Sequence, residues 1–358
     1  MAEVLLVGVT HYPPLMGLDR DMSWVLQWTL QDPDIPETLK RTENWPSEMQ
    51  SEYGDDAGEA SAAGHRATLV DGFRKVRGAI DDFAPDVVVF WGDDQYENFR
   101  EDVIPPFCVL AYDDIVATPW ALPKWANKEN IWSEPPEMTL EVKGAREFGL
   151  AFATQLLERD IDMSYAYEPL HYATLSHAFL NALLLLDYDR TGFPYPVLPV
   201  AVNCYGSRVV SHGGGLSRLA DRERPLDPPG PTPRRCMTMG AAMAEIAAAS
   251  PWKVAFVASS SWSHAFLTDH TYRLYPDIPA DRALFESLVK GDYETWRSTT
   301  TADIEHAGQQ EVLNWFCLAG AAEALGVVPD WSRLVETFVF NSNKVFATYP
   351  VVAAGSRA

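Results

Sequence analysis

The chain has little cysteine, and none of it is paired in sequence. Its four cysteines, Cys108, Cys204, Cys236 and Cys317, stand far apart in 358 residues and form no C-x-x-C motif. Disulfide scaffolds and thiolate zinc sites place their cysteines at close, recurrent spacings. The sequence therefore excludes both classes of site, and we expect four reduced cysteines packed in the interior.

Positive charge is scarce, and long apolar runs are missing. Lys and Arg number 28 against 50 Asp and Glu, a net charge of −22, which opposes binding to a nucleic acid or to an anionic membrane surface. No apolar stretch reaches the roughly 18 residues of a membrane span, and no secretory signal pattern begins the chain. We expect a cytoplasmic protein with neither a nucleic acid nor a membrane as partner.

Strand-like and helical patterns alternate along the chain. Apolar runs typical of buried strands lie at 3–9, 85–91, 106–112, 195–203 and 252–259. Helical periodicity lies at 63–83, 142–160, 232–250 and 308–326. This alternation predicts an α/β fold with a central mostly parallel or mixed sheet flanked by helices. The acidic segment at about 24–58 lacks a strand signal, and is either a lid of short helices over the crevice or a plain surface insertion.

Histidines and carboxylates follow three of the predicted strands. His11 ends the first strand, the acidic turn 93–97 ends the second, and His264 and His270 follow the strand at 252–259. The carboxyl ends of parallel strands share one crevice in α/β sheets. Two histidines and one carboxylate form the facial triad of non-haem Fe(II) sites. The same acidic turn is also typical of helix caps and magnesium sites, and zinc or magnesium hydrolysis remains an alternative.

Six segments, in order, resemble the class III extradiol dioxygenases, the LigB-like protocatechuate 4,5-dioxygenase catalytic-subunit superfamily. The segments are "GVTHYP", "PDVVVFWGDDQYENF", "LSHAFLNALLLLDY", "YPVLPVAVNCYG" with "PTPRRCMTMGAAM", "SSSWSHAF" and "EVLNWFCLAGA". The resemblance spans most of the chain. It implies one LigB-like catalytic domain over 1–358, with an insertion at about 24–58, that binds Fe(II) and uses O2.

The resemblance also implies roles for individual histidines. His11 matches a metal-binding histidine, His177 the histidine that faces the substrate ring, and His264 an acid/base histidine near the oxygen site. A histidine with a near-neutral pKa suits such proton transfers. His171 lies close enough in sequence to take the place of His177. The remaining histidines, His65, His212 and His306, are expected to be structural or surface residues.

Two positions depart from the family pattern. Gln95 stands where the family has its second metal histidine, and His270 falls at or next to a position where some members have the metal glutamate. A swap of ligand types restores the triad, with His11, Glu97 and His270 as metal ligands. The alternatives are binding by the Gln95 amide oxygen, binding by Asp93 or Asp94, and loss of the metal.

Aromatic residues and Gln95 are the expected substrate contacts. We predict that Tyr12, Gln95 and Trp262 bind the substrate, and that Trp91 and Tyr96 help to wall the cavity against a flat ring. Bulky residues also replace the family's glycine pair at 260–262, which indicates a reshaped pocket.

The sequence thus predicts an Fe(II)-dependent dioxygenase that cleaves or oxidises a catechol-like aromatic substrate with O2. One alternative is an oxygenase acting on an aminophenol, a hydroxypyridine or a non-aromatic chelator. Another is a non-enzymatic binding member of the superfamily. Many relatives associate, so a homo-oligomer is also expected.

Overall fold

The computed structural model describes residues 3–122, 128–172, 174–208, 210–216 and 218–353. Its central element is a nine-stranded mixed sheet with the strand order β6-β3-β7-β2-β8-β1-β10-β9, and β11 pairs with β1. The strands are β1 (Glu3–Val9), β2 (Val87–Asp93), β3 (Phe107–Leu110), β6 (Ser164–Ala166), β7 (Val197–Val202), β8 (Lys253–Ser259), β9 (Trp331–Val335), β10 (Lys344–Thr348) and β11 (Val352–Ala353). The predicted α/β class is confirmed.

The inner strands of the sheet are parallel. β7, β2, β8 and β1 run in one direction, whereas β3 and β10 are antiparallel to β7 and β1. The carboxyl ends of β2, β8 and β1 therefore lie side by side at one edge. This is the edge at which the sequence predicted the site, because those strands carry the histidines and the acidic turn.

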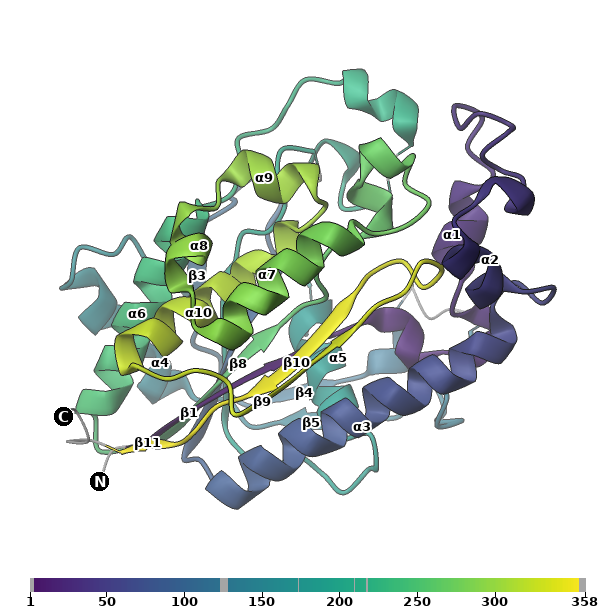
Figure 1. Cartoon of the computed structure of the whole chain (residues 1–358). Coiled ribbons are helices and arrows are strands. Elements are labelled where there is room, and N and C mark those ends of the chain that lie inside the picture. The colour runs from purple at the N-terminus through teal and green to yellow at the C-terminus, as the bar shows by residue number, and fades with distance from the viewer. Residues whose placement is uncertain (1–2, 123–127, 173, 209, 217, 354–358) are drawn as a thin grey trace.

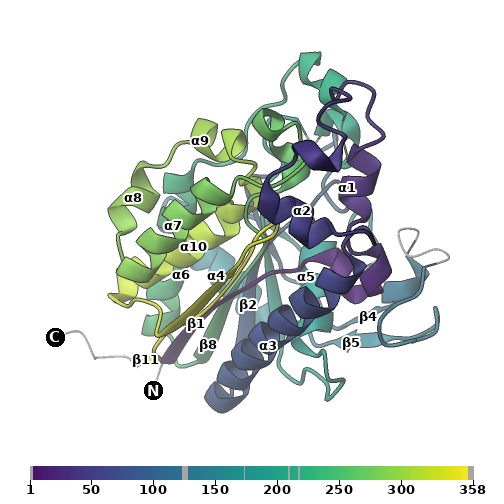
Figure 2. The same cartoon turned by 45° about the vertical axis from the view of Figure 1, so that its right-hand side comes forward.

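Helices cover both faces of the sheet (Figures 1 and 2). One layer contains α4 (Arg146–Leu157), α6 (Pro233–Ala249), α7 (Ile278–Lys290), α8 (Tyr293–Ser298) and α10 (Leu313–Leu325). The opposite layer contains α3 (Glu59–Phe83) and α5 (His177–Leu186). α9 (Thr301–His306) lies between α8 and α10 in sequence. The four helices predicted from periodicity correspond to α3, α4, α6 and α10.

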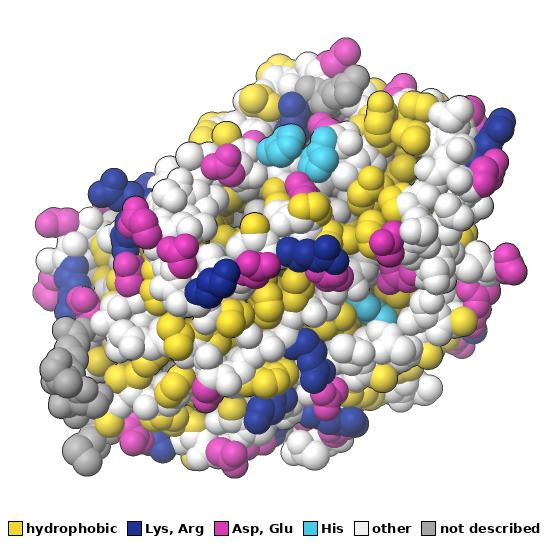
Figure 3. Space-filling view, viewed as in Figure 1, with side chains coloured by type: hydrophobic (Ala, Val, Ile, Leu, Met, Phe, Trp, Pro, Cys, Tyr) yellow, Lys and Arg dark blue, Asp and Glu magenta, His cyan; other side chains and the backbone are white. Residues whose placement is uncertain are grey.

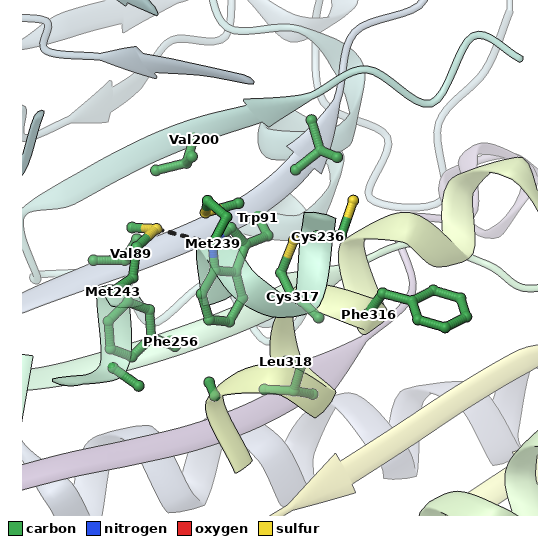
Figure 4. Close-up of a cluster of buried hydrophobic side chains, with 14 of the residues drawn as sticks. Val89, Trp91, Val200, Cys236, Met239, Met243, Phe256, Phe316, Cys317 and Leu318 are labelled. Carbon is green, nitrogen blue, oxygen red and sulfur yellow. Dashed lines mark hydrogen bonds between the residues drawn. The ribbon is translucent and has the colours of Figure 1, made fainter. Parts of the chain in front are cut away.

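Strand alternation decides which helices each side chain meets. Val89 and Trp91 of β2 lie in the core under α6 and α10, while Val88 and Phe90 face the α3 and α5 layer. In the first core, Trp91 stacks on Phe256 and donates its indole N–H to the sulfur of Met243 (Figure 4). Each face of the sheet has its own apolar core because successive strand side chains point to opposite faces.

The acidic segment at 24–58 contains short helices. They are α1 (Trp24–Thr29) and α2 (Ser47–Tyr53), separated by one 3-10 turn at Thr42–Asn44. A separate two-stranded sheet is formed by β4 (Ile115–Ala117) and β5 (Leu140–Val142). Among the described residues, no helix combines the length and the apolar composition needed to cross a membrane.

The cysteines lie in the interior, and basic side chains are spread over the surface. All four cysteines are buried and free, which confirms the prediction of packed thiols. Acidic and basic side chains are interspersed on the face shown in Figure 3, without a continuous basic patch.

Candidate active site

His11 follows β1 and is buried at the carboxyl edge of the sheet. Its Nδ1 lies 3.1 Å from the carbonyl oxygen of Ser259, the last residue of β8. A carbonyl only accepts hydrogen bonds, so Nδ1 carries the proton and Nε2 carries the lone pair that a metal ligand needs. Nε2 lies 3.8 Å from Oδ1 of Asp93 and 3.5 Å from Oε2 of Glu311.

Asp93 ends β2 and is completely buried. Its Oδ1 accepts a 3.4 Å hydrogen bond from Nδ2 of Asn314, but no described residue donates to Oδ2. Oδ2 lies 3.9 Å from Nε2 of His177. Burial raises the pKa of Asp93 to about 6, and the opposing influence of His177 is smaller. A buried carboxylate oxygen without a donor is costly unless a cation completes its environment.

His177 is held by Glu97 from the side away from Asp93. The Glu97 carboxylate accepts the backbone N–H of His177 at 2.9 Å, and its Oε2 lies 2.9 Å from the ring Nδ1. This places a negative charge at the N-terminus of α5, where the helix dipole favours it. Nδ1 therefore carries the proton, and Nε2 is the acceptor nitrogen. His11, Asp93 and His177 each offer one donor atom within 4.8 Å of the others.

Glu311 is the site residue that the sequence interpretation missed. It lies in a 3-10 turn, Gln310–Val312, directly before α10. Gln95 donates to its Oε1 at 2.7 Å, whereas no described residue donates a hydrogen bond to Oε2. Burial, and then the charge of Asp93, raise the pKa of Glu311. The signal was present in the "EVLNWFCLAGA" segment as a carboxylate at the start of an otherwise apolar helix.

His264 lies on the far side of Glu311. Its Nε2 is 3.4 Å from Oε2 of Glu311. Burial lowers its pKa to about 3, so the ring is neutral at physiological pH. The three histidines that the resemblance assigned to the site, His11, His177 and His264, thus surround Asp93 and Glu311.

The structure does not bring His270 to this cluster. His270 follows the His264 turn in a further 3-10 turn, where its Nε2 lies 3.2 Å from Oδ2 of Asp277 and its ring stacks on His306 at 4.6 Å. It lines a different cavity of about 390 Å³. The predicted ligand set of His11, Glu97 and His270 is therefore not assembled. Glu97 does not complete it either, since its carboxylate binds the ring and the backbone of His177.

Two of the alternatives left open by the sequence are answered by hydrogen bonding. The carboxylate of Asp94 accepts backbone N–H groups of Glu97, Asn98 and Phe99, so it caps the turn after β2. His171 lies on the surface with its Nε2 at 2.8 Å from Asp102. His177 rather than His171 faces the cluster.

The predicted aromatic wall is corrected by the structure. Trp262 packs against Trp296 and Trp315, and Trp91 lies in the core under α6. Tyr12 is buried, with its hydroxyl donating to the carbonyl of Met22 at 3.3 Å. Large aromatic rings gain most from complete burial, and none of these three lines a cavity at the site.

A cavity of about 790 Å³ opens beside the cluster. Its lining includes Gln95, Glu97 and His177, and substrate binding by Gln95 stays a prediction. The remaining lining comes from the segment after His11, from the insertion and from nearby loops: Pro13, Pro14, Gly17, Arg20, Asp21, Trp24, Lys128, Glu129 and Gly214.

No protein-family model matches the chain. Curated relatives from Comamonas testosteroni, Paraburkholderia xenovorans and Paraburkholderia phymatum are each named 2,3-dihydroxyphenylpropionate/2,3-dihydroxicinnamic acid 1,2-dioxygenase. Identities are 24%, 27% and 27%, over 57%, 70% and 78% of this chain. The matches span 50%, 79% and 90% of those relatives, so the Comamonas match covers half of that protein. The resemblance to class III extradiol dioxygenases is thereby confirmed.

Proposed function

We propose that this chain is an Fe(II)-dependent dioxygenase that uses O2 to cleave or oxidise a catechol-like ring. The relatives, all named dioxygenases, support the expectation of an enzyme that incorporates O2. The observation that carries the proposal is the buried cluster of imidazoles and carboxylates at the carboxyl edge of the sheet, beside a cavity of about 790 Å³. Ligands of α/β folds bind at this edge.

We propose His11, Asp93 and Glu311 as the metal ligands. Nε2 of His11 lies 3.8 Å from Oδ1 of Asp93 and 3.5 Å from Oε2 of Glu311. Oε2 of Glu311 and the second Asp93 oxygen, Oδ2, which lies 3.9 Å from Nε2 of His177, are buried without a described donor. A divalent cation would supply the missing partner to both. This set has one histidine and two carboxylates, so a carboxylate compensates for the family histidine that Gln95 replaces. Bound Fe(II) would supply chelation of the two catechol oxygens and the reaction of O2 with the ring.

We propose for His177 and His264 the acid/base roles that the family resemblance implies. Glu97 holds the proton on Nδ1 of His177, so Nε2 accepts a phenolic proton from a ring in the cavity. The Glu97 carboxylate then stabilises the imidazolium that forms. His264, neutral and adjacent to Glu311, is the second group within the site that exchanges a proton.

Three further expectations belong to this proposal. They are one catalytic domain over 1–358, a cytoplasmic location and a homo-oligomeric state. Sedimentation of the purified chain measures the last of these, and cell fractionation measures the second.

Metal analysis of variants tests the ligand set. The chain is purified anaerobically, loaded with Fe(II), and desalted before its iron is measured. We expect Asp93→Asn and Glu311→Gln to lose the stoichiometric iron that the wild type holds, while His177→Asn and the matched control His270→Ala retain it. Retention by Glu311→Gln with loss by His177→Asn would instead assign the third ligand to His177.

Oxygen uptake tests the reaction. Catechol and 2,3-dihydroxyphenylpropionate should consume O2 with Fe(II)-loaded wild type and not with Asp93→Asn. Uptake with 2-aminophenol or a hydroxypyridine alone would favour the alternative substrates. An intact fold with neither iron nor O2 uptake would favour a binding protein and contradict the proposal.

A further inference from the structure

We propose that the substrate of this site is a catechol that carries a second, uncharged ring, and that Trp24 binds this second ring. The inference deepens the proposed function and rests on it. Its first support is size. A cavity of about 790 Å³ lies within the range that encloses drug-sized ligands, so a single catechol ring leaves much of it unfilled.

The second support is the position of Trp24. It is the first residue of α1, and the next two residues, Val25 and Leu26, are buried in the core. Trp24 instead lines the cavity and is 42% exposed. α1 is therefore anchored by its inner face and holds a large flat ring at the rim of the cavity. Tryptophan offers such contact area with few rotatable bonds to immobilise.

The third support is the wall that joins the two ends of the cavity. Pro13 and Pro14 follow His11 closely in sequence and line the cavity together with Trp24 and His177. They begin a 3-10 turn, Pro13–Met16, whose ring-locked backbone keeps this wall stiff. Pro13 and Pro14 thus add stiff apolar surface to the same cavity that Trp24 and His177 line.

The fourth support is the charge balance of the rim. Among its described residues, Arg20 and Lys128 are matched by Asp21 and Glu129. Arg20 pairs with Glu129 at 2.7 Å, and Nζ of Lys128 lies 5.5 Å from the centre of the Trp24 ring. The rim therefore has no surplus of positive charge to select a carboxylate arm. The relatives are named for acids, and the lining here favours a neutral ring.

Anaerobic binding of three diols to the Fe(II)-loaded protein tests the proposal. We expect 2,3-dihydroxybiphenyl to bind more tightly than catechol or 2,3-dihydroxyphenylpropionate. Trp24→Ala should weaken the two-ring ligand about tenfold, the usual scale for a lost apolar contact in a pocket, and leave catechol binding unchanged. The matched control is Trp28→Ala, because Trp28 lies on the same helix but does not line the cavity.

A second probe separates this inference from the iron chemistry. 2-Hydroxybiphenyl lacks the second hydroxyl needed for chelation, and we expect it to bind metal-free protein in a manner that Trp24→Ala weakens and Trp28→Ala does not. Equal binding by wild type and Trp24→Ala overturns the inference even if the iron experiments succeed. Tighter binding of 2,3-dihydroxyphenylpropionate, lost in Lys128→Ala, would assign an anionic arm instead and also overturn it.

Discussion

At the scale of single residues, identical side chains next to one another have different tasks. Asp94 is saturated by backbone N–H groups and by the hydroxyl of Tyr205, which donates at 2.8 Å. Asp93 has one oxygen that no described group satisfies. Alternation along β2 sends only one of the two carboxylates to the layer that contains α10 and Asn314. Asp94 is thus a structural cap, and Asp93 is the candidate ligand.

Glu97→Gln tests how His177 is positioned. In Glu97→Gln one oxygen can still accept from the ring, but the NH2 group then faces the backbone N–H of His177, and the negative charge that stabilises a protonated ring is lost. We expect the rate of catechol oxidation at saturation to fall about 10–100-fold, with a changed pH profile. The free energy of unfolding should fall by about 1 kcal/mol.

The control for this change is Glu101→Gln. Glu101 accepts a hydrogen bond from the hydroxyl of Tyr96 at the surface, outside the cavity lining. It should leave the rate and its pH profile unchanged. A wild-type pH profile in Glu97→Gln would refute the positioning role.

At the scale of elements, the contact between α6 and α10 sets the position of Glu311. A Cβ added at Gly240 of α6 would lie 1.9 Å from the carbonyl oxygen of Cys317. A Cβ at Gly320 of α10 would lie 2.0 Å from that of Met237. The two backbones are therefore as close as their atoms allow, and this close packing anchors the helix that directly follows Glu311.

Gly240→Ala tests this packing. Because the obstacle is backbone rather than a flexible side chain, α10 must shift, and we expect a loss of about 3 kcal/mol in the free energy of unfolding. Gly64→Ala in α3 is the matched control, since its added Cβ would meet no atom within 4 Å apart from its chain neighbours and the nearby backbone of its own helix. The control should gain up to about 1 kcal/mol in urea unfolding, because alanine favours helix. Equal stability of the two variants would contradict the close contact.

At the scale of the whole molecule, Asp281 links segments that are distant in sequence. This α7 residue is fully buried and accepts hydrogen bonds from the backbone N–H of Ser263, from Gln309 at 2.6 Å and from Asn343 at 2.7 Å. It thereby joins the turn before His264, the approach to α10 and the start of β10. Burial raises the pKa of Asp281 to about 7, although these hydrogen bonds partly oppose the shift.

Asp281→Asn tests the pH dependence of stability. The folded-state pKa lies above the ordinary value of 3.8, so the folded protein binds the proton more tightly than the unfolded chain. The contribution of Asp281 to stability therefore falls as pH rises from about 4 to about 7, at about 1.4 kcal/mol per pH unit where the slope is full. The variant lacks this titration. Metal-free wild type should lose about 2–3 kcal/mol relative to the variant between pH 5 and pH 8 in urea unfolding.

The opposite trend would contradict this assignment. If wild type gains stability over Asp281→Asn as pH rises, the three donors outweigh burial and hold the carboxylate ionised. A parallel pH dependence of both proteins would show that another group titrates.

Much of this architecture follows from local sequence pattern. The apolar runs at 3–9, 85–91 and 252–259 predict β1, β2 and β8, because a buried parallel strand needs a continuous apolar run and little else. The placement of His11 and the acidic turn after such strands predicts their shared edge. The family resemblance, rather than local pattern, implied that His177 and His264 lie near His11.

What only the tertiary structure decided is which oxygen atoms face His11. The sequence favoured Glu97 over Asp93 and Asp94, because the directions of side chains in a turn depend on hydrogen bonds that the sequence does not show. Glu311 comes from the opposite end of the chain, and the packing of α10 against α6 brings it to His11. Tertiary structure also excluded His270, because the turn that carries it leads to a different cavity. Composition and periodicity are local properties, whereas a ligand set depends on long-range packing.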